Sequence, residues 1–153
     1  MIYISSAQII STHDKVLNIS GGRPGVKNIE YLESVVQNIQ IDHYYPEIES
    51  KLTHLVFSIN KFHAFIDGNK RTSIAAGALF LEYNGFDGLV SKFIREMENI
   101  AVCVAENFID KEVLEEIIYS ILFESDYSEE LKMKIIMAQG KMDDIASNLD
   151  DIY

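Results

Sequence analysis

The chain has 153 residues, of which 48% are apolar and 24% charged, and this length and composition suit one domain with a substantial core. Its formal net charge of −11 argues against non-specific binding to nucleic acid or to an anionic membrane, so a protein or small-molecule partner fits better. The N-terminus has no secretory signal pattern, no stretch is long enough to span a bilayer, and the single Cys103 cannot form an internal disulfide. We therefore expect a cytoplasmic protein.

Helical patterns follow one another along the chain and predict an all-α fold. Apolar residues recur at steps of three and four, and one segment, residues 72–83, is apolar on almost all sides, as a central helix would be. Asn84 and Gly85 would end that helix. The expected helices cover residues 6–18, 28–39, 51–62, 72–83, 91–105 and 111–123.

The last segment of the chain has a different pattern. After Glu124 the composition becomes acidic, and apolar residues then alternate at steps of four and three: Leu131, Ile135, Ala138, Met142, Ile145, Leu149 and Ile152. This pattern predicts an amphipathic helix with a weak point at Gly140. We therefore divide the chain into a domain over residues 1–123 and a C-terminal amphipathic extension over residues 124–153. The extension would either pack back on the domain, pair with a second copy of the chain, or restrain the active site.

Residues 63–72, with the sequence HAFIDGNKRT, carry the chemistry that we expect of this chain. They lie at the start of the predicted central helix, where backbone N–H groups lack partners and the helix dipole is positive, so the position favours an anion. Gly68 permits a tight turn, and Lys70 and Arg71 add positive charge. Asp67 is a suitable ligand for Mg²⁺, and His63 could accept a proton from a hydroxyl group.

Each of these residue types, taken alone, is more often structural than catalytic. A base, a metal-binding carboxylate, a glycine turn and two cations within ten residues, however, are the groups that phosphoryl or nucleotidyl transfer requires. The segment is not a Walker loop, because it lacks the preceding glycine and spacer. The sequence therefore predicts a transferase that acts on a nucleotide.

The segment resembles the signature of Fic/Doc proteins, His-x-Phe-x-Asp/Glu-Gly-Asn-Gly/Lys-Arg. Lys70 stands where most Fic proteins have a second glycine, and Ile74 stands where they have a second arginine. Both departures place the chain nearer to the Doc (death-on-curing) toxin branch. Residues 12–34 also resemble the Doc N-terminal helix with its Gly-Gly-x-Pro-Gly loop, and the resemblance covers residues 1–123.

The resemblance implies a Fic-type helical bundle with a central motif helix and a short flap loop or hairpin. It implies that His63 is the general base toward a Ser, Thr or Tyr of a target protein, that Phe65 anchors the loop in the core, and that Asp67 holds Mg²⁺. The residues implied to bind phosphate are Gly68, Asn69, Lys70 and Arg71. The flap that would dock the target as an added strand comprises Gly21, Gly22, Arg23, Pro24 and Gly25.

The expected function is that of a toxin from a toxin–antitoxin system, with a protein of bacterial translation as target and an antitoxin as partner. ATP or another nucleoside triphosphate, with Mg²⁺, would be the co-substrate. Lys70 would fill part of the nest that a glycine leaves open, so we expect transfer of the terminal phosphate; AMP transfer and a catalytically idle interaction domain are the alternatives. Ser120 to Glu124 and Ser125 to Glu129 have the spacing of the Fic inhibitory helix but lack its following Gly or Asn.

The other histidines are expected to be structural or exposed. His54 falls on the helix of residues 51–62, whereas the pairs His13-Asp14 and Asp42-His43 look exposed. A metal-dependent phosphohydrolase of the HD type would need a histidine before the His-Asp pair, and none precedes His13.

Overall fold

The computed structural model describes residues 1–152 and the side chains of residues 1–148. Within this part of the chain the protein is all-α, as predicted, and no strand forms; residues Val26 and Phe65 make an isolated antiparallel bridge. The elements are α1 (Ser6–Ser20), α2 (Ile29–Asn38), α3 (Ile48–Lys61), α4 (Asn69–Tyr83), the 3₁₀ helix η1 (Asp87–Leu89), α5 (Val90–Ala105), α6 (Lys111–Phe123) and α7 (Glu129–Ile152). None of these helices is both long and apolar enough to cross a bilayer.

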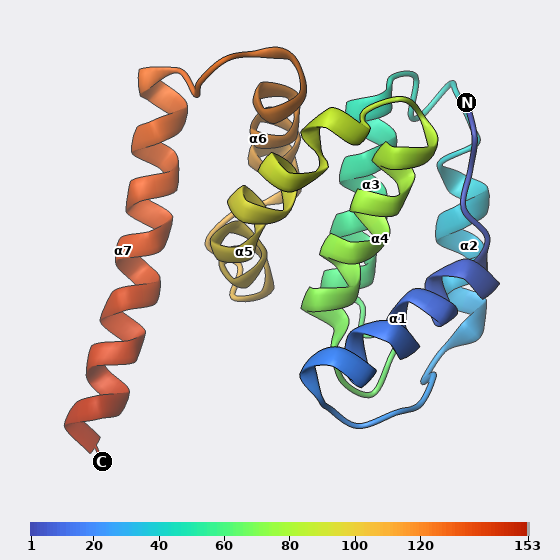
Figure 1. Cartoon of the computed structure of the whole chain (residues 1–153). Helices are drawn as coiled ribbons and strands as arrows, with labels where there is room; N and C mark the ends of the chain where they lie inside the picture. Colours follow the sequence, from blue (N-terminus) through green and yellow to red (C-terminus); the bar gives the residue numbers. More distant parts are fainter. Residues whose placement is uncertain (153) are drawn as a thin grey trace.

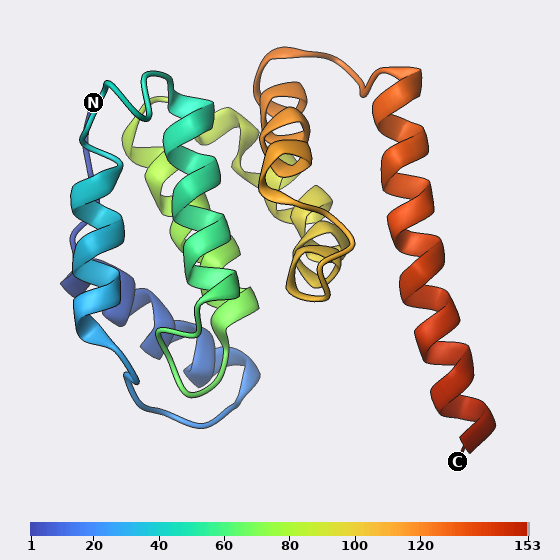
Figure 2. The same ribbon diagram turned by 180° about the vertical axis from the view of Figure 1, so that it is seen from behind.

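Helices α3 and α4 lie side by side in the middle of the molecule (Figure 1). Helix α1 crosses one end of this pair and α2 lies beside it, while α5 and α6 pack on the other side and α7 is outermost (Figures 1 and 2). The loop from α3 to α4 and the loop from α1 to α2 lie at the same end. This arrangement brings two segments that are far apart in sequence to one place.

Helix α4 is central because it is apolar on most sides. Phe80 and Leu81 are fully buried, and Gly77 permits a close approach to both neighbouring helices: a Cβ at Gly77 would lie 2.9 Å from Val56 of α3 and 3.0 Å from the Phe93 ring of α5. A larger residue at this position would push the three helices apart, at a cost typical of an overpacked core. The prediction of a central motif helix is therefore confirmed.

Two helices begin three residues earlier than the sequence pattern predicted. Helix α3 starts at Ile48, because the Ser50 hydroxyl accepts a hydrogen bond from the Glu47 N–H (3.1 Å) and closes the first turn. Helix α4 starts at Asn69, because the preceding Gly68 has a left-handed backbone conformation (φ 78°) that does not belong to an α-helix. Asn69, and with it Lys70 and Arg71, therefore belongs to the first turn of α4.

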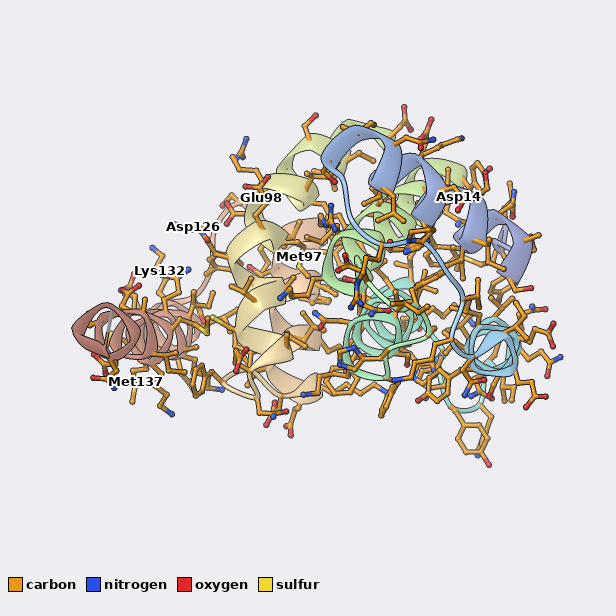
Figure 3. All side chains as sticks on the ribbon, turned by 90° about the horizontal axis from the view of Figure 1, so that it is seen from below. Asp14, Met97, Glu98, Asp126, Lys132 and Met137 are labelled. Atoms are coloured by element: carbon orange, nitrogen blue, oxygen red, sulfur yellow. The ribbon has the colours of Figure 1, made fainter. Side chains whose placement is uncertain are left out.

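Helix α7 packs on the rest of the molecule through its first half. Leu131, Ile135 and Ala138 are buried, whereas Ile145 is exposed. Lys134 of α7 forms an ion pair with Glu116 of α6 (3.2 Å). Within the extension, Lys132 pairs with Asp126 (2.9 Å), and Figure 3 shows these two side chains next to each other. Packing of the extension on the domain is therefore observed. The side chains of Leu149 and Ile152, which complete the predicted stripe, lie outside the described side chains.

Candidate active site

The loop between α3 and α4 is held in shape by Asn69. Its amide Oδ1 accepts a hydrogen bond from the Phe65 N–H (3.0 Å), and its Nδ2 donates to the Phe65 carbonyl oxygen (2.9 Å). Phe65 is fully buried, which agrees with its expected role as an anchor. The Asn69 side chain therefore holds the shape of the loop, and Asn69 is also the first residue of α4.

His63 lies at the start of this loop with its side chain exposed. Its φ of 51° is unusual for a residue with a Cβ, and strain of this kind is found often at functional sites. Asn69 Nδ2 donates a long hydrogen bond of 3.4 Å to His63 Nδ1. The bond places the imidazole beside the first turn of α4.

The N-terminus of α4 opens into a cavity of about 380 Å³. Gly68 precedes the helix in a left-handed conformation and provides no side-chain cap, so the first-turn N–H groups and the positive end of the dipole are directed outward. Except for Phe65, every motif residue with a predicted role lines this cavity: His63, Asp67, Gly68, Asn69, Lys70 and Arg71. The structure therefore brings together the predicted base, the carboxylate and the phosphate-binding residues.

Asp67 is kept ionised by its surroundings. Its carboxylate accepts hydrogen bonds from the backbone N–H of Arg23 (2.9 Å) and of Gly68 (2.8 Å). These bonds, together with the positive charges of Arg71 and Arg23, hold the pKa of the Asp67 carboxyl below its usual value. Among the described residues no group of three or more His, Cys, Asp or Glu side chains could hold a metal ion. One ionised carboxylate beside an anion site suits Mg²⁺, which commonly takes few protein ligands and completes its shell with phosphate oxygens and water.

The predicted flap lies directly over Asp67 and Arg71. Arg71 Nη1 donates to the Gly21 carbonyl oxygen (2.8 Å) and to the Ser20 hydroxyl. At Gly22 a Cβ would lie 2.9 Å from Asp67 Oδ2 and 3.0 Å from Arg71 Nη2, so only glycine permits this approach. The flap residues Arg23 and Pro24 are exposed.

The end of the flap joins the motif loop through main-chain hydrogen bonds. The Ile66 N–H donates to the Gly25 carbonyl oxygen (3.1 Å), and the N–H groups of Lys27 and Asn28 both donate to the Ala64 carbonyl oxygen. These bonds surround the single antiparallel bridge between Val26 and Phe65. The flap is therefore a loop with one bridge, and its residues 21–24 are exposed.

The prediction that His13 is exposed was wrong. Its side chain is 1% exposed, its Nε2 lies 2.7 Å from the Asp67 carbonyl oxygen, and its ring stacks on Phe65. The neighbouring Asp14 is exposed at the edge of α1, as Figure 3 shows. The sequence did carry a signal for burial, because Ile9, His13 and Leu17 recur at steps of four on one face of α1.

A second and larger cavity, of about 770 Å³, lies away from the motif between α3, α6 and α7. Its lining carries many glutamates and one basic residue: Glu47, Glu49, Glu112, Glu115, Glu116, Glu124, Glu130 and Lys134. Such a concentration of negative charge repels phosphate. The smaller cavity at the start of α4 is therefore the candidate site for a nucleotide.

In this all-α domain the motif loop and the uncapped N-terminus of α4 bring a histidine, a carboxylate and two cations to one cavity, and these features together define the class of this protein. Comparisons with known proteins agree. The model of the Fic/DOC family matches residues 3–81, which include the flap and the whole motif. The chain belongs to the Fic/DOC family.

Two relatives are similar to part of this chain. The "Protein kinase doc" of Escherichia phage P1 is 35% identical over 89 residues, which are 56% of this chain and 70% of the relative. The "Toxin Doc" of Mycolicibacterium smegmatis is 38% identical over 69 residues, which are 42% of this chain and 53% of that relative. The chain thus spans only about half the length of the second relative.

Proposed function

We propose that this protein is a Doc-like toxin that phosphorylates a hydroxyl group of a target protein, with ATP or another nucleoside triphosphate as donor. The observation that carries the proposal is the gathering of His63, Asp67, Lys70 and Arg71 around one cavity at an uncapped helix N-terminus. The similarity to a relative named protein kinase supports the same chemistry. Catalysis of phosphoryl transfer consists mainly of positioning and charge stabilisation, and this cavity offers both.

In the proposed reaction the target hydroxyl attacks the γ-phosphorus. A bond forms between the hydroxyl oxygen and phosphorus, the bond from phosphorus to the bridging oxygen of the donor breaks, and the nucleoside diphosphate leaves. His63 accepts the hydroxyl proton. The N–H groups at the start of α4, with Lys70 and Arg71, hold the phosphate oxygens. Mg²⁺ on Asp67 would neutralise part of the polyphosphate charge.

Lys70 is the reason for proposing phosphate rather than AMP transfer. It follows the N-cap Gly68 by two residues and lies exposed at the cavity, where its ammonium adds a point charge beside the backbone donors. With this charge present, the polyphosphate would bind with its terminal phosphorus toward His63. AMP transfer is the alternative chemistry at the same site.

The experiment that tests the function uses the purified protein, Mg²⁺ and ATP labelled at either the α- or the γ-phosphate, added to a bacterial lysate. We expect label from γ-labelled ATP in one or a few proteins, and intact-protein mass spectrometry should show a phosphate adduct. His63→Ala should reduce transfer by at least about a hundredfold with the fold preserved, because this exposed side chain acts in chemistry and not in packing.

The outcomes separate the alternatives. An AMP adduct would show adenylyl transfer and leave the site assignment intact, whereas no label from either nucleotide would favour an interaction domain without activity. Transfer by His63→Ala at the wild-type rate would exclude His63 as the base. As a toxin of this branch the protein would act on a component of translation and be neutralised by an antitoxin, and both partners are part of the proposal.

A further inference from the structure

We propose that His13 is a positioning residue of the active site: it locks the Asp67–Gly68 peptide so that the Gly68 N–H stays directed toward the anion site. This inference rests on the proposed function, because it concerns the same cavity. A histidine of α1, 54 residues before Asp67, is buried against the motif loop, and the motif alone does not explain this contact.

The hydrogen bond has a defined direction. His13 Nε2 lies 2.7 Å from the Asp67 carbonyl oxygen, and a carbonyl oxygen can only accept, so Nε2 carries the proton and donates. The ring is held in place by stacking on Phe65, with centroids 3.9 Å apart and planes 7° from parallel. His13 therefore presents one fixed donor to one backbone atom of the loop.

This bond determines where the neighbouring N–H is directed. In a planar trans peptide the C=O and the N–H point in opposite directions. With the Asp67 carbonyl oxygen fixed toward α1, the Gly68 N–H is directed away from α1, where it donates to Asp67 Oδ1 (2.8 Å) at the cavity. The same N–H thus holds the Asp67 carboxylate, the proposed metal ligand, at the edge of the proposed anion site.

Such a lock is needed because Gly68 is a glycine. Its φ of 78° is accessible without strain only to a residue lacking a Cβ, and the same freedom lets the preceding peptide plane rotate. A Cβ at Gly68 would also lie 3.3 Å from Leu17 Cδ2 and 3.6 Å from His13 Nε2, so α1 packs closely beneath this turn. The helix thus supplies from outside the rigidity that the glycine lacks.

The test compares two substitutions that divide the two roles of the ring. His13→Phe keeps an aromatic ring on Phe65 but removes the donor, whereas His13→Gln places an amide N–H near the position of Nε2 but removes the stacking. Three properties of each variant are to be measured. They are its thermal unfolding, the amide ¹H–¹⁵N resonance and hydrogen exchange of Gly68 in the nucleotide-free protein, and its affinity for Mg-ATP. His43→Gln, at an exposed histidine, is the control.

For His13→Phe we expect a shifted Gly68 resonance with faster exchange, and Mg-ATP affinity roughly threefold to tenfold weaker, the effect of losing one net hydrogen bond. For His13→Gln we expect a lower Tm but a Gly68 resonance and an affinity close to wild type. Gly85, which has no heavy atom near its Cβ position, serves as internal reference. A purely structural role of His13 would instead change affinity in parallel with Tm.

The lock is refuted if Gly68 behaves alike in wild type and His13→Phe, or if His13→Gln disturbs Gly68 as strongly as His13→Phe does. Should the wild-type protein bind no Mg-nucleotide, the proposed function fails, and the Gly68 measurements on the nucleotide-free protein still decide whether the lock exists. The two failures are therefore distinguishable.

Discussion

His54, on α3, is held in its neutral form by its contacts in the folded protein. Its Nδ1 accepts hydrogen bonds from Lys111 Nζ (2.8 Å) and the Tyr45 hydroxyl (3.1 Å). Because an ammonium can only donate, the ring is neutral in the folded state. Burial, and then the nearby Lys111 charge, lower the pKa of His54 to about 4. The prediction that this histidine is structural agrees with these contacts.

We predict that the free energy of unfolding falls as the pH decreases from about 6.5 to about 4. The folded-state pKa of His54 lies below the ordinary value, so over this window the unfolded chain binds the proton more readily. His54→Asn keeps an acceptor near the position of Nδ1 and cannot be protonated. The His54→Asn substitution should remove most of this decrease in the free energy of unfolding, which urea unfolding at several pH values measures. His43→Asn should leave the pH profile unchanged, and an identical profile for His54→Asn would contradict the assignment.

Asn69 is predicted to be essential for the shape of the motif loop. Asn69→Ala removes both hydrogen bonds to Phe65 and leaves a buried N–H and C=O without partners, which costs about 1–3 kcal/mol for each unsatisfied group. We expect a clear loss of stability in urea unfolding together with a large loss of transfer. The exposed Asn148→Ala should change neither property. A variant Asn69→Ala with wild-type stability would show that the loop is held by other contacts.

The residues of the motif could be predicted from the sequence because they are close together in it. His63, Asp67 and Arg71 all belong to one loop and the helix turn that follows it, and they line the same cavity. His13 and Ser20 could not be assigned in this way, since their contacts with the motif depend on how α1 crosses α3 and α4. Both residues contribute through tertiary contacts. Periodicity within a helix indicates that a residue is buried but not which residues it contacts.

At the scale of elements, helix order was predictable and helix ends were less so. Each predicted helix exists, because apolar periodicity reports which face is buried. Helices α3 and α4 begin earlier than predicted because a hydroxyl and a glycine determine their first turns. Periodicity carries no information on such caps, and it does not specify which helices become neighbours.

The packing of α7 can be tested with two adjacent residues, one buried and one exposed. Ala138 is 2% exposed and Met137 is 62% exposed. We predict that Ala138→Asp lowers the free energy of unfolding by at least about 2 kcal/mol, because it buries an unpaired charge, and that Met137→Asp changes it by less than about 0.5 kcal/mol. Figure 3 shows Met137 on the outer helix. Urea unfolding of both variants provides the comparison, and equal effects would mean that α7 does not pack in solution as described.

Pairing of the chain through α7 remains a prediction. Met133, Ile136 and Met137 form an exposed apolar strip on the side of α7 that faces away from Leu131 and Ile135. The mass in solution over a range of concentrations decides between a monomer and a homo-oligomer.

At the scale of the whole molecule, the site and the C-terminal extension are separate. The family match ends at residue 81, within α4, and among the residues whose side chains the structure describes none that lines the candidate cavity belongs to α7. We predict that removal of residues 128–153 lowers Tm by several degrees, since it exposes the apolar surface beneath Leu131 and Ile135, but leaves the transfer rate within about twofold of wild type. Calorimetry and the labelling assay measure the two effects. A large loss of transfer at a temperature where the truncated protein is folded would assign the extension a role in activity.

The contacts of the flap with Asp67 and Arg71 bear on the order of binding. In this structure Arg71 holds Gly21 and the Asp67 carboxylate holds Arg23, but the proposed reaction assigns the same two side chains to phosphate and Mg²⁺. On the proposed assignment the two sets of contacts would compete, so a bound nucleotide would loosen the flap. Because coupling between two equilibria is reciprocal, a target segment that drew the flap away would raise the affinity for the nucleotide. The donor would then be held tightly mainly when an acceptor protein is present, which limits the transfer of phosphate to water.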